Sequence, residues 1–286
     1  MRLRDSVNRG EGAPARRHGR GAFAAVVRAR LAVGAALILI ALAASCDRPE
    51  AREVIDTPAA VAAAAAEVPR ARPGYAVREV ADGGRITGWV IAAHAPRDTV
   101  VQVDSDQARC GRTRRMPLVE RRGTRVTDAV VWLEGVARGK PMPLVRRYVL
   151  ESFRCAYRPR VQAAAAGGTL NVRSRDPLEL RTRFTMDGRV LDVVEETDAG
   201  QVVPTGKVLA DSGLVQVLSQ THSWSRAWIR VFDHPYFAAT TRDGTFRIDS
   251  IPPGTYRLVV WQPALGVRDT TVTVSAKAER VVHVAY

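Results

Sequence analysis

The feature that most constrains the fold is a long series of short β-branched segments after residue 80. Gly and Pro turn signals separate these segments, and none keeps the 3.6-residue apolar period of a helix. The segments are 85–92, 99–103, 129–133, 169–172, 191–195, 213–218, 227–232, 245–248, 255–261, 269–274 and 280–284. Many short strands with regular turns predict an all-β protein. Because 286 residues are too many for one ordinary domain, we expect two β-sandwiches in series.

The first 46 residues have the pattern of an export signal. Eight arginines and two acidic residues precede Cys46, and an unbroken apolar run covers 31–44. This run is shorter than the about 20 residues that span a bilayer, and it fits the apolar core of a signal peptide. Cys46 directly follows Leu42-Ala-Ala-Ser, which resembles the bacterial lipobox. We therefore expect 1–46 to be a signal peptide with a lipobox and Cys46 to carry the lipid; an uncleaved anchor, or secretion with Cys46 as a spare thiol, is the alternative.

The next segment, 47–80, is rich in Pro and Ala and has no period-2 pattern. This composition predicts a disordered linker between the lipid and the folded part.

The two remaining cysteines, Cys110 and Cys155, form an even pair in an oxidising compartment. We expect a Cys110–Cys155 disulfide, which would close a loop of about 45 residues and contribute about 3 to 4 kcal/mol.

The C-terminal part carries the signals of one small module. Asp243-Gly244 predicts a tight turn, Pro252-Pro253-Gly254 predicts a rigid one, and apolar residues alternate around the second turn. This string resembles the carboxypeptidase regulatory-like domain, a transthyretin-like sandwich, over 228–286. The resemblance also implies a carbohydrate-binding-like fold, in which Tyr236, Phe237 and Trp261 are candidate sugar contacts. The alternative is that these rings fill the core or the domain seam.

The preceding part, 81–227, carries a second set of motifs. They are Gly88-Trp89-Val90, Cys110-Gly111, 128–136, Cys155 with Tyr157-Arg158-Pro159, Ser174-Arg175-Asp176-Pro177 and 222–228. In this order they resemble the plastocyanin-like (cupredoxin) proteins that carry a C-terminal regulatory-like domain. The resemblance implies a cupredoxin-like sandwich over 81–227.

The resemblance also implies a copper site, but its ligands are missing. Type-1 copper needs two imidazoles, a thiolate and a weak thioether. The family pattern has a His after Asp-Pro and a later Cys-x-x-His-x-x-Met. Here no His follows Pro177, and the later motif reads Ser219-x-x-His222-x-x-Ser225. Only His222 remains, as a weak candidate metal ligand, so we expect no cofactor, copper included; a site built from distant strands is the alternative.

Positive charge is concentrated between Cys110 and Arg175. Fifteen Lys and Arg residues there oppose four acidic ones, while the whole chain has a net charge of +14. A basic face over 110–175 would attract anionic lipid or acidic glycan near a bilayer. The alternative is a solvated surface in a chain that prefers Arg to Lys. Nucleic acid is not expected as a partner, because an exported domain rarely meets it.

The sequence also lacks the common catalytic motifs. It has no Gly-x-Ser-x-Gly elbow, no His-Glu-x-x-His and no phosphate-binding Gly loop after a strand. We therefore expect no enzyme activity. The expected protein is a lipid-anchored, periplasm-facing component of the bacterial cell envelope that acts as a binding or structural module, with an unidentified envelope protein as partner. The alternatives are a copper-binding, electron-transfer cupredoxin with an atypical site and a carbohydrate-binding module.

Overall fold

The structure, a computed structural model, describes residues 74–196 and 198–286. The predicted signal peptide at 1–46, including Cys46, lies outside these residues, and so does the predicted linker up to residue 73. The described residues belong to one compact unit. Within the described ranges no helix is long and apolar enough to cross a membrane.

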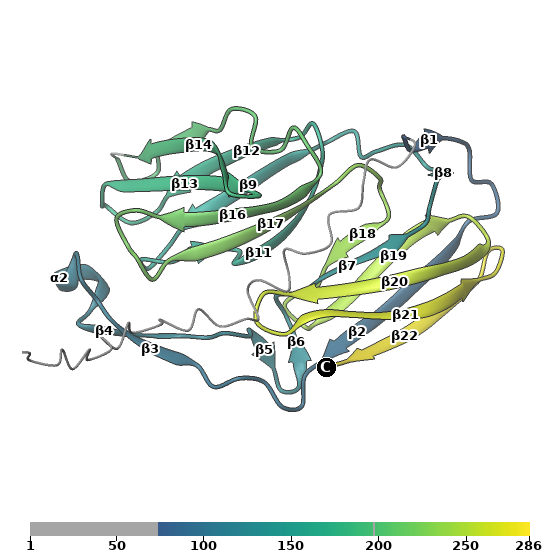
Figure 1. The fold of residues 1–286 in the computed structure, drawn as a ribbon, viewed down its shortest axis with the longest axis horizontal. Helices are drawn as coiled ribbons and strands as arrows, with labels where there is room; N and C mark the ends of the chain where they lie inside the picture. The colour runs from purple at the N-terminus through teal and green to yellow at the C-terminus, as the bar shows by residue number, and fades with distance from the viewer. Residues whose placement is uncertain (1–73, 197) are drawn as a thin grey trace, which may run out of the picture. The chain divides into compact units, whose positions relative to one another are not determined.

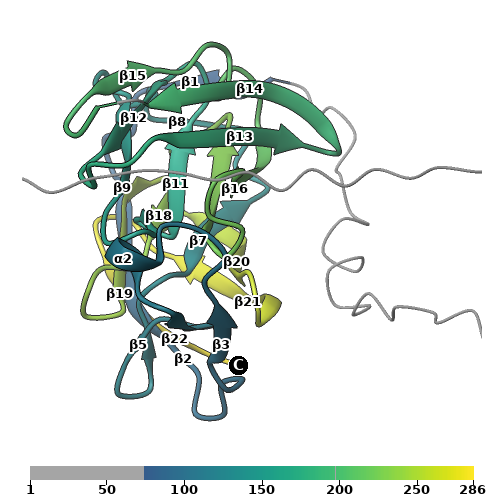
Figure 2. The same ribbon diagram turned by 90° about the vertical axis from the view of Figure 1, so that its left-hand side faces the viewer.

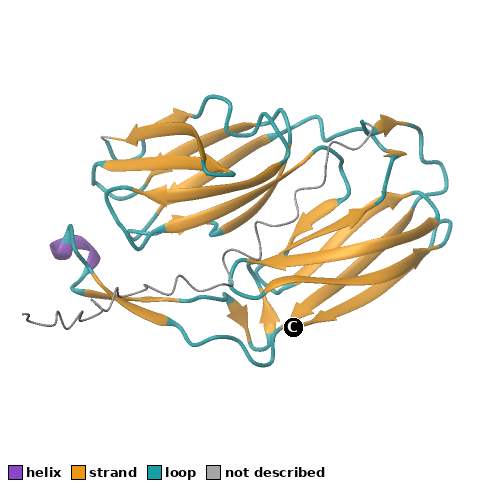
Figure 3. Ribbon diagram, viewed as in Figure 1, coloured by secondary structure: helices purple, strands orange, loops and turns teal. Residues whose placement is uncertain are grey.

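Strands make up nearly all of the regular structure, which confirms the predicted all-β class (Figure 3). The described ranges contain 22 strands and one short helix, α2 (Gln107–Cys110). The strands form two β-sandwiches, a two-stranded ribbon and one short parallel pair.

The first sandwich takes its strands from both ends of the described chain, and we call it the terminal sandwich (Figure 1). One of its sheets has the order β18-β7-β20-β21, and the other has the order β19-β2-β6-β5 with β22 beside β2. The strands are β2 (Gly84–Ile91), β5 (Arg121–Arg122), β6 (Arg125–Val126), β7 (Val130–Glu134), β18 (Phe237–Ala239), β19 (Thr245–Ile251), β20 (Gly254–Gln262), β21 (Gly266–Val274) and β22 (Glu279–Ala285).

Alternating residues fill the core of the terminal sandwich. In β2 every second residue is buried, and Ile86 and Val90 meet Leu258 and Val260 of β20 in one cluster. Gly88 of β2 must be glycine, because a Cβ there would lie 1.8 Å from the carbonyl oxygen of Val282 in the adjacent strand β22. This close approach lets the last strand of the chain pair in parallel with one of the first.

The second sandwich lies between these strands in sequence, and we call it the inserted sandwich. One sheet has the order β10-β9-β12-β15 and the other β11-β17-β16-β13-β14, with β14 as an edge strand (Figure 2). The strands are β9 (Arg147–Ser152), β10 (Tyr157–Arg158), β11 (Val161–Ala165), β12 (Thr169–Ser174), β13 (Leu180–Met186), β14 (Arg189–Glu196), β15 (Val202–Pro204), β16 (Gly213–Ser219) and β17 (Arg226–Phe232). Its core is a separate cluster that includes Leu150, Phe184 and Ile229.

The strand pairing corrects the expected serial arrangement. The predicted boundary between 81–227 and 228–286 does not separate the sandwiches, because β2, β5, β6 and β7 share sheets with the strands after residue 236. Only 147–232 form the inserted sandwich. A serial division follows from the rule that sequential strands tend to be neighbours, and the parallel β2–β22 pair is an exception to it.

The predicted linker 47–80 also ends earlier than expected. Tyr75 packs against the terminal core, and its hydroxyl donates a 2.6 Å hydrogen bond to the carbonyl oxygen of Lys140. The strand β1 (Ala76–Val77) then pairs with β8 (Arg138–Gly139). The folded part therefore includes at least the residues from Tyr75 onward.

Within the part of the chain that the structure describes, one two-stranded ribbon joins no other sheet. It consists of β3 (Thr99–Gln102) and β4 (Thr113–Met116), with α2 at its far end (Figure 1). We call residues 99–116 the arm. Because an isolated two-stranded ribbon is marginally stable in water, the arm depends on what holds its tip.

An apolar seam joins the two sandwiches. Trp132 of β7 and Trp261 of β20 pack against Val161 of β11 and Phe232 of β17. The seam explains why the second half of β20 is buried on both faces, whereas its first half alternates. Beside it, Arg160 and Asp128 form an ion pair in which both side chains are largely buried.

Candidate functional site

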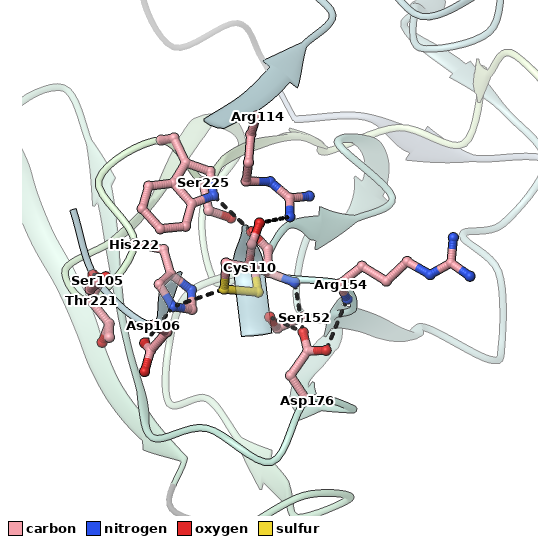
Figure 4. The surroundings of a disulfide bond; sticks show 12 residues. Ser105, Asp106, Cys110, Arg114, Ser152, Arg154, Asp176, Thr221, His222 and Ser225 are labelled. Atoms are coloured by element: carbon pink, nitrogen blue, oxygen red, sulfur yellow. Dashed lines mark hydrogen bonds and ion pairs between the residues drawn. A yellow bond between two sulfur atoms is a disulfide. The ribbon is translucent and has the colours of Figure 1, made fainter. Parts of the chain in front are cut away.

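The candidate site is the loop 219–225, which joins β16 to β17 at one end of the inserted sandwich. Its sequence, Ser219-x-x-His222-x-x-Ser225, contains only one residue of the ligand pattern that the resemblance implies. The structure brings three other segments to it: the tip of the arm, the turn that contains Cys155, and the loop after β12 that contains Asp176 (Figure 4). The site is therefore assembled from segments that are far apart in sequence.

His222 is a buried side chain with its own protein partners. It is 1% exposed, and its Nε2 lies 2.9 Å from Oδ2 of Asp106 and 3.9 Å from Sγ of Cys110. Its ring stacks on that of Trp224 with 4.8 Å between the ring centroids. Its backbone N–H donates to Oγ of Ser219. These contacts fix the ring in place and occupy the nitrogen that faces the arm.

The predicted disulfide between Cys110 and Cys155 is present, with 5.8 Å between the Cα atoms. Cys155 lies in a turn in which it and Arg154 both have positive φ, a conformation that costs energy in residues other than glycine. The buried carboxylate of Asp176 accepts hydrogen bonds from both backbone N–H groups, at 3.0 and 2.8 Å. Asp176 thus holds the turn that presents Cys155 to the arm.

Hydrogen bonds between the arm tip and the loop supplement the disulfide. The hydroxyl of Ser105 donates to the carbonyl oxygen of Thr221, and the hydroxyl of Ser223 donates to the carboxylate of Asp104, both at 2.8 Å. Together with the contact between His222 and Asp106, they attach the tip of the arm to the loop.

The residues in this loop do not fit a type-1 copper centre. Serine hydroxyls replace the thiolate and the thioether, and both are already bonded: Ser219 accepts from the His222 amide and Ser225 accepts from the Tyr157 amide. The sulfur atoms of Cys110 and Cys155 beside the loop are joined in the disulfide, so neither is a thiolate. Across the described residues, no group of three or more His, Cys, Asp or Glu side chains could hold a metal ion.

A buried polar chain extends from the loop into the inserted sandwich. The Tyr157 hydroxyl lies 2.7 Å from the Thr182 hydroxyl, which in turn donates to Oε1 of Glu196 at 3.1 Å. Oε2 of Glu196 is buried and has no hydrogen-bond partner among the described residues. Burial raises the pKa of Glu196 to about 7, although the Thr182 hydroxyl favours the ionised form. The carboxyl group is therefore protonated over much of the acidic range.

The basic stretch 110–175 is divided among several elements. Its cations lie on the arm, on both sandwiches and on β8, and six of them form ion pairs. The pairs are Arg115–Asp98, Arg122–Asp243, Arg158–Glu120, Arg160–Asp128, Arg173–Glu151 and Arg175–Glu151. Attraction of anionic lipid or glycan to the remaining cations stays a prediction.

Two of the three candidate sugar contacts are buried, and the third is partly buried. Tyr236 is fully buried in the core of the terminal sandwich, and Trp261 is buried in the seam. Phe237 packs at the edge of the seam and stacks on Phe232, with 4.5 Å between the ring centroids. Because a sugar needs an open ring face, these residues fill the core and the seam instead.

Sequence reasoning missed an aromatic stack on the outer face of the β19-β2-β22 layer. The rings of Trp89 and His283 stack with centroids 3.5 Å apart, and the guanidinium of Arg125 lies 4.6 Å from the Trp89 ring centroid. Two hollows are lined by outward-facing residues of this layer, and neither lining includes Trp89 or His283. One is lined by Arg122, Arg125, Asp243 and Thr245, and the other by residues that include Arg85, Arg247, Asp249, Lys277 and Glu279. The alternation in β2 indicates that Trp89 points outward, but nothing local in sequence pairs it with His283.

Comparisons with known proteins identify related β-sandwich modules. A family model described as polysaccharide lyase family 4, domain II, matches residues 202–282, from β15 to β22. This family differs from the carboxypeptidase regulatory-like domain expected from the sequence. No curated protein matches the chain.

Several solved structures of copper proteins are weakly similar. A purple cupredoxin from Nitrosopumilus maritimus is 14% identical, with 30% of this chain and 99% of that chain covered and a TM-score of 0.26. Amicyanin from Paracoccus versutus is 15% identical, with 32% and 85% covered and a TM-score of 0.26. A copper-containing nitrite reductase from Thermus scotoductus SA-01 is 16% identical, with 32% and 23% covered and a TM-score of 0.25. At these TM-scores the similarity carries no argument about function.

Proposed function

We propose that the chain is a non-catalytic binding or structural module of the bacterial cell envelope, held at the membrane by a lipid on Cys46. The observation that carries the non-catalytic part is the state of the loop 219–225. His222 is buried against Asp106, Trp224 and the disulfide, and both serine hydroxyls are bonded within the protein. Because contacts within the protein already fill this loop, we expect a partner to bind at the outer surfaces instead. The export signal and Cys46 support the location.

The test of this proposal is copper loading of the purified full chain, followed by metal analysis and a visible spectrum. We expect no stoichiometric copper and no thiolate absorption band, because both cysteines of the described residues are joined in the disulfide. Stoichiometric copper with a strong visible band would contradict the proposal and favour the alternative, an electron-transfer protein with an atypical site. Intact-mass analysis of the same preparation tests the lipid on Cys46 separately.

A carbohydrate-binding module is a second candidate, favoured by the match to a domain of a polysaccharide lyase family. The described surface that best suits an acidic polymer is the outer face of the β19-β2-β22 layer, where the two hollows are lined by cations while the Trp89 ring is covered by His283 and Arg125. Anionic sugars would find Arg125 and Arg85 there. Affinity measurements with acidic and neutral polysaccharides test this candidate: Arg125→Ala should weaken binding of the acidic polymer, whereas Arg189→Ala, at an exposed arginine of β14 on the inserted sandwich, should not. Equal affinity of the two variants would exclude this surface.

A further inference from the structure

The loop between β8 and β9 exposes an unusual apolar tip. It reads Pro141-Met-Pro-Leu-Val145, and Leu144 is 99% exposed while Val145 is 77% exposed. Single exposed apolar residues are common on protein surfaces. Two neighbouring branched side chains that protrude almost completely from a loop are a feature of surfaces that contact something apolar.

The loop is held firmly at both ends. On one side the Lys140 amide donates to the hydroxyl of Tyr236 at 2.9 Å, and the Lys140 ammonium donates to the carbonyl oxygen of Asp249 at 2.6 Å. On the other side the Arg146 guanidinium donates to the carbonyl oxygen of Ala166 at 2.8 Å. Pro141 and Pro143 further restrict the backbone between these ends. The apolar tip is therefore presented on a fixed base.

The chain enters the described structure beside this loop. The strand β1 pairs with β8, so that Val77 lies opposite Gly139, and the Tyr75 hydroxyl bonds the carbonyl oxygen of Lys140. The 73 residues before this point include Cys46 and the apolar run 31–44. The segment that follows Cys46 therefore joins the described structure beside the apolar tip.

The charges around the tip are mainly positive. Arg78, Arg138 and Arg147 are exposed next to the loop or on the strands that flank it, and Glu79 is the exposed acidic residue beside them. Apolar residues surrounded by arginines suit an interface of acyl chains and anionic phosphates. A soluble protein partner would more often meet a flat, mixed surface with aromatic residues at its centre.

We propose that the loop 141–145 docks into the surface of an anionic lipid bilayer. Leu144 and Val145 enter the boundary between head groups and acyl chains, and the flanking arginines contact the phosphates. The proposal rests on the proposed membrane attachment, which it extends: the lipid brings the protein to the bilayer, and the loop sets which side of the protein faces it.

The experiment places a tryptophan at the tip of the loop in the full chain purified from membranes. Leu144→Trp is compared with Val100→Trp, a matched control at an exposed valine on the arm. Each variant is reconstituted in phosphatidylglycerol vesicles. The tryptophan emission of the unmodified chain under the same conditions is subtracted, so that the difference emission reports the introduced tryptophan. We expect lipids brominated on the acyl chain to lower the Leu144→Trp difference emission by about twofold, since interfacial residues lie within reach of the bromines. The Val100→Trp signal should not change.

Equal quenching of the two variants would overturn the proposal, and so would a Leu144→Trp signal that responds to a protein partner but not to vesicles. Replacement of phosphatidylglycerol by phosphatidylcholine should reduce the quenching, because the arginines then face no net negative charge. Intact-mass analysis distinguishes a failure of the proposed lipid anchor from a failure of the proposed docking of the loop. A chain without lipid on Cys46 contradicts the proposed anchor, and the loop is still tested by adding vesicles to that same chain.

Discussion

At the scale of single residues, Glu196 gives the clearest pH dependence. Burial raises its pKa in the folded protein to about 7, above the ordinary value of 4.5, so the folded protein keeps a proton that the unfolded chain has lost between these two pH values. The contribution to stability is present below pH 4.5 and is lost as the pH rises toward 7, by on the order of 2 to 3 kcal/mol. Glu196→Gln should therefore flatten the pH profile of the free energy of unfolding, measured with urea from pH 5 to 8.

The matched control for this prediction is the adjacent, exposed Glu195. Glu195→Gln should leave the profile of the unmodified chain unchanged, because its carboxylate is largely solvated. Asp128, whose pKa burial also raises to about 7, contributes equally to all three proteins, so the difference isolates Glu196. A Glu196→Gln profile as steep as that of the unmodified chain would contradict the assignment.

At the scale of elements, the arm depends on its disulfide. Without the bond between Cys110 and Cys155, the tip is held by hydrogen bonds and by the contact between Asp106 and His222. We expect Cys110→Ser/Cys155→Ser to lower the free energy of unfolding by about 3 to 4 kcal/mol. We also expect amide hydrogen exchange to rise in 99–116 more than in either sandwich, because an isolated ribbon is marginal.

The control for the arm is Asp104→Ala, which removes the hydrogen bond from Ser223 and a longer one from Ser105 but keeps the disulfide. Its exchange in 99–116 should stay close to that of the unmodified chain. If the cysteine double variant also exchanges at the unmodified rate there, the ribbon is stable by itself and the prediction is wrong.

The same elements show which features a sequence can reveal. β-Branched runs between turn signals located strands such as 99–103 and 245–248 to within a few residues, and cysteine pairing located the disulfide. The strand signal is local in sequence, and the disulfide signal follows from the number of cysteines. The partner of His222 is Asp106, which lies 116 residues away and has no motif to mark it. The parallel pairing of β2 with β22 is equally non-local, and for that reason the serial division into domains was wrong.

At the scale of the whole molecule, the pair Asp128–Arg160 links the two sandwiches. Asp128 precedes β7 and Arg160 precedes β11; their side chains are 3% and 11% exposed. The Asp128 carboxylate also accepts hydrogen bonds from the Glu120 amide and the Gln262 side chain. A buried cation that loses its partner is costly, so Asp128→Ala should lower the free energy of unfolding by about 3 to 5 kcal/mol in urea denaturation.

Replacement of both charged residues tests whether the lost stability comes from the unpaired charge of Arg160 or from the missing hydrogen bonds of the pair. In Asp128→Leu/Arg160→Met no charge is left unpaired, and apolar side chains extend the seam formed by Trp132, Trp261 and Phe232. Because well-packed apolar residues often replace a buried ion pair at little cost, the double variant should be clearly more stable than Asp128→Ala. A double variant as unstable as the single one would show that the sandwiches need the hydrogen bonds of the pair, and not merely the absence of an unpaired charge, to stay joined.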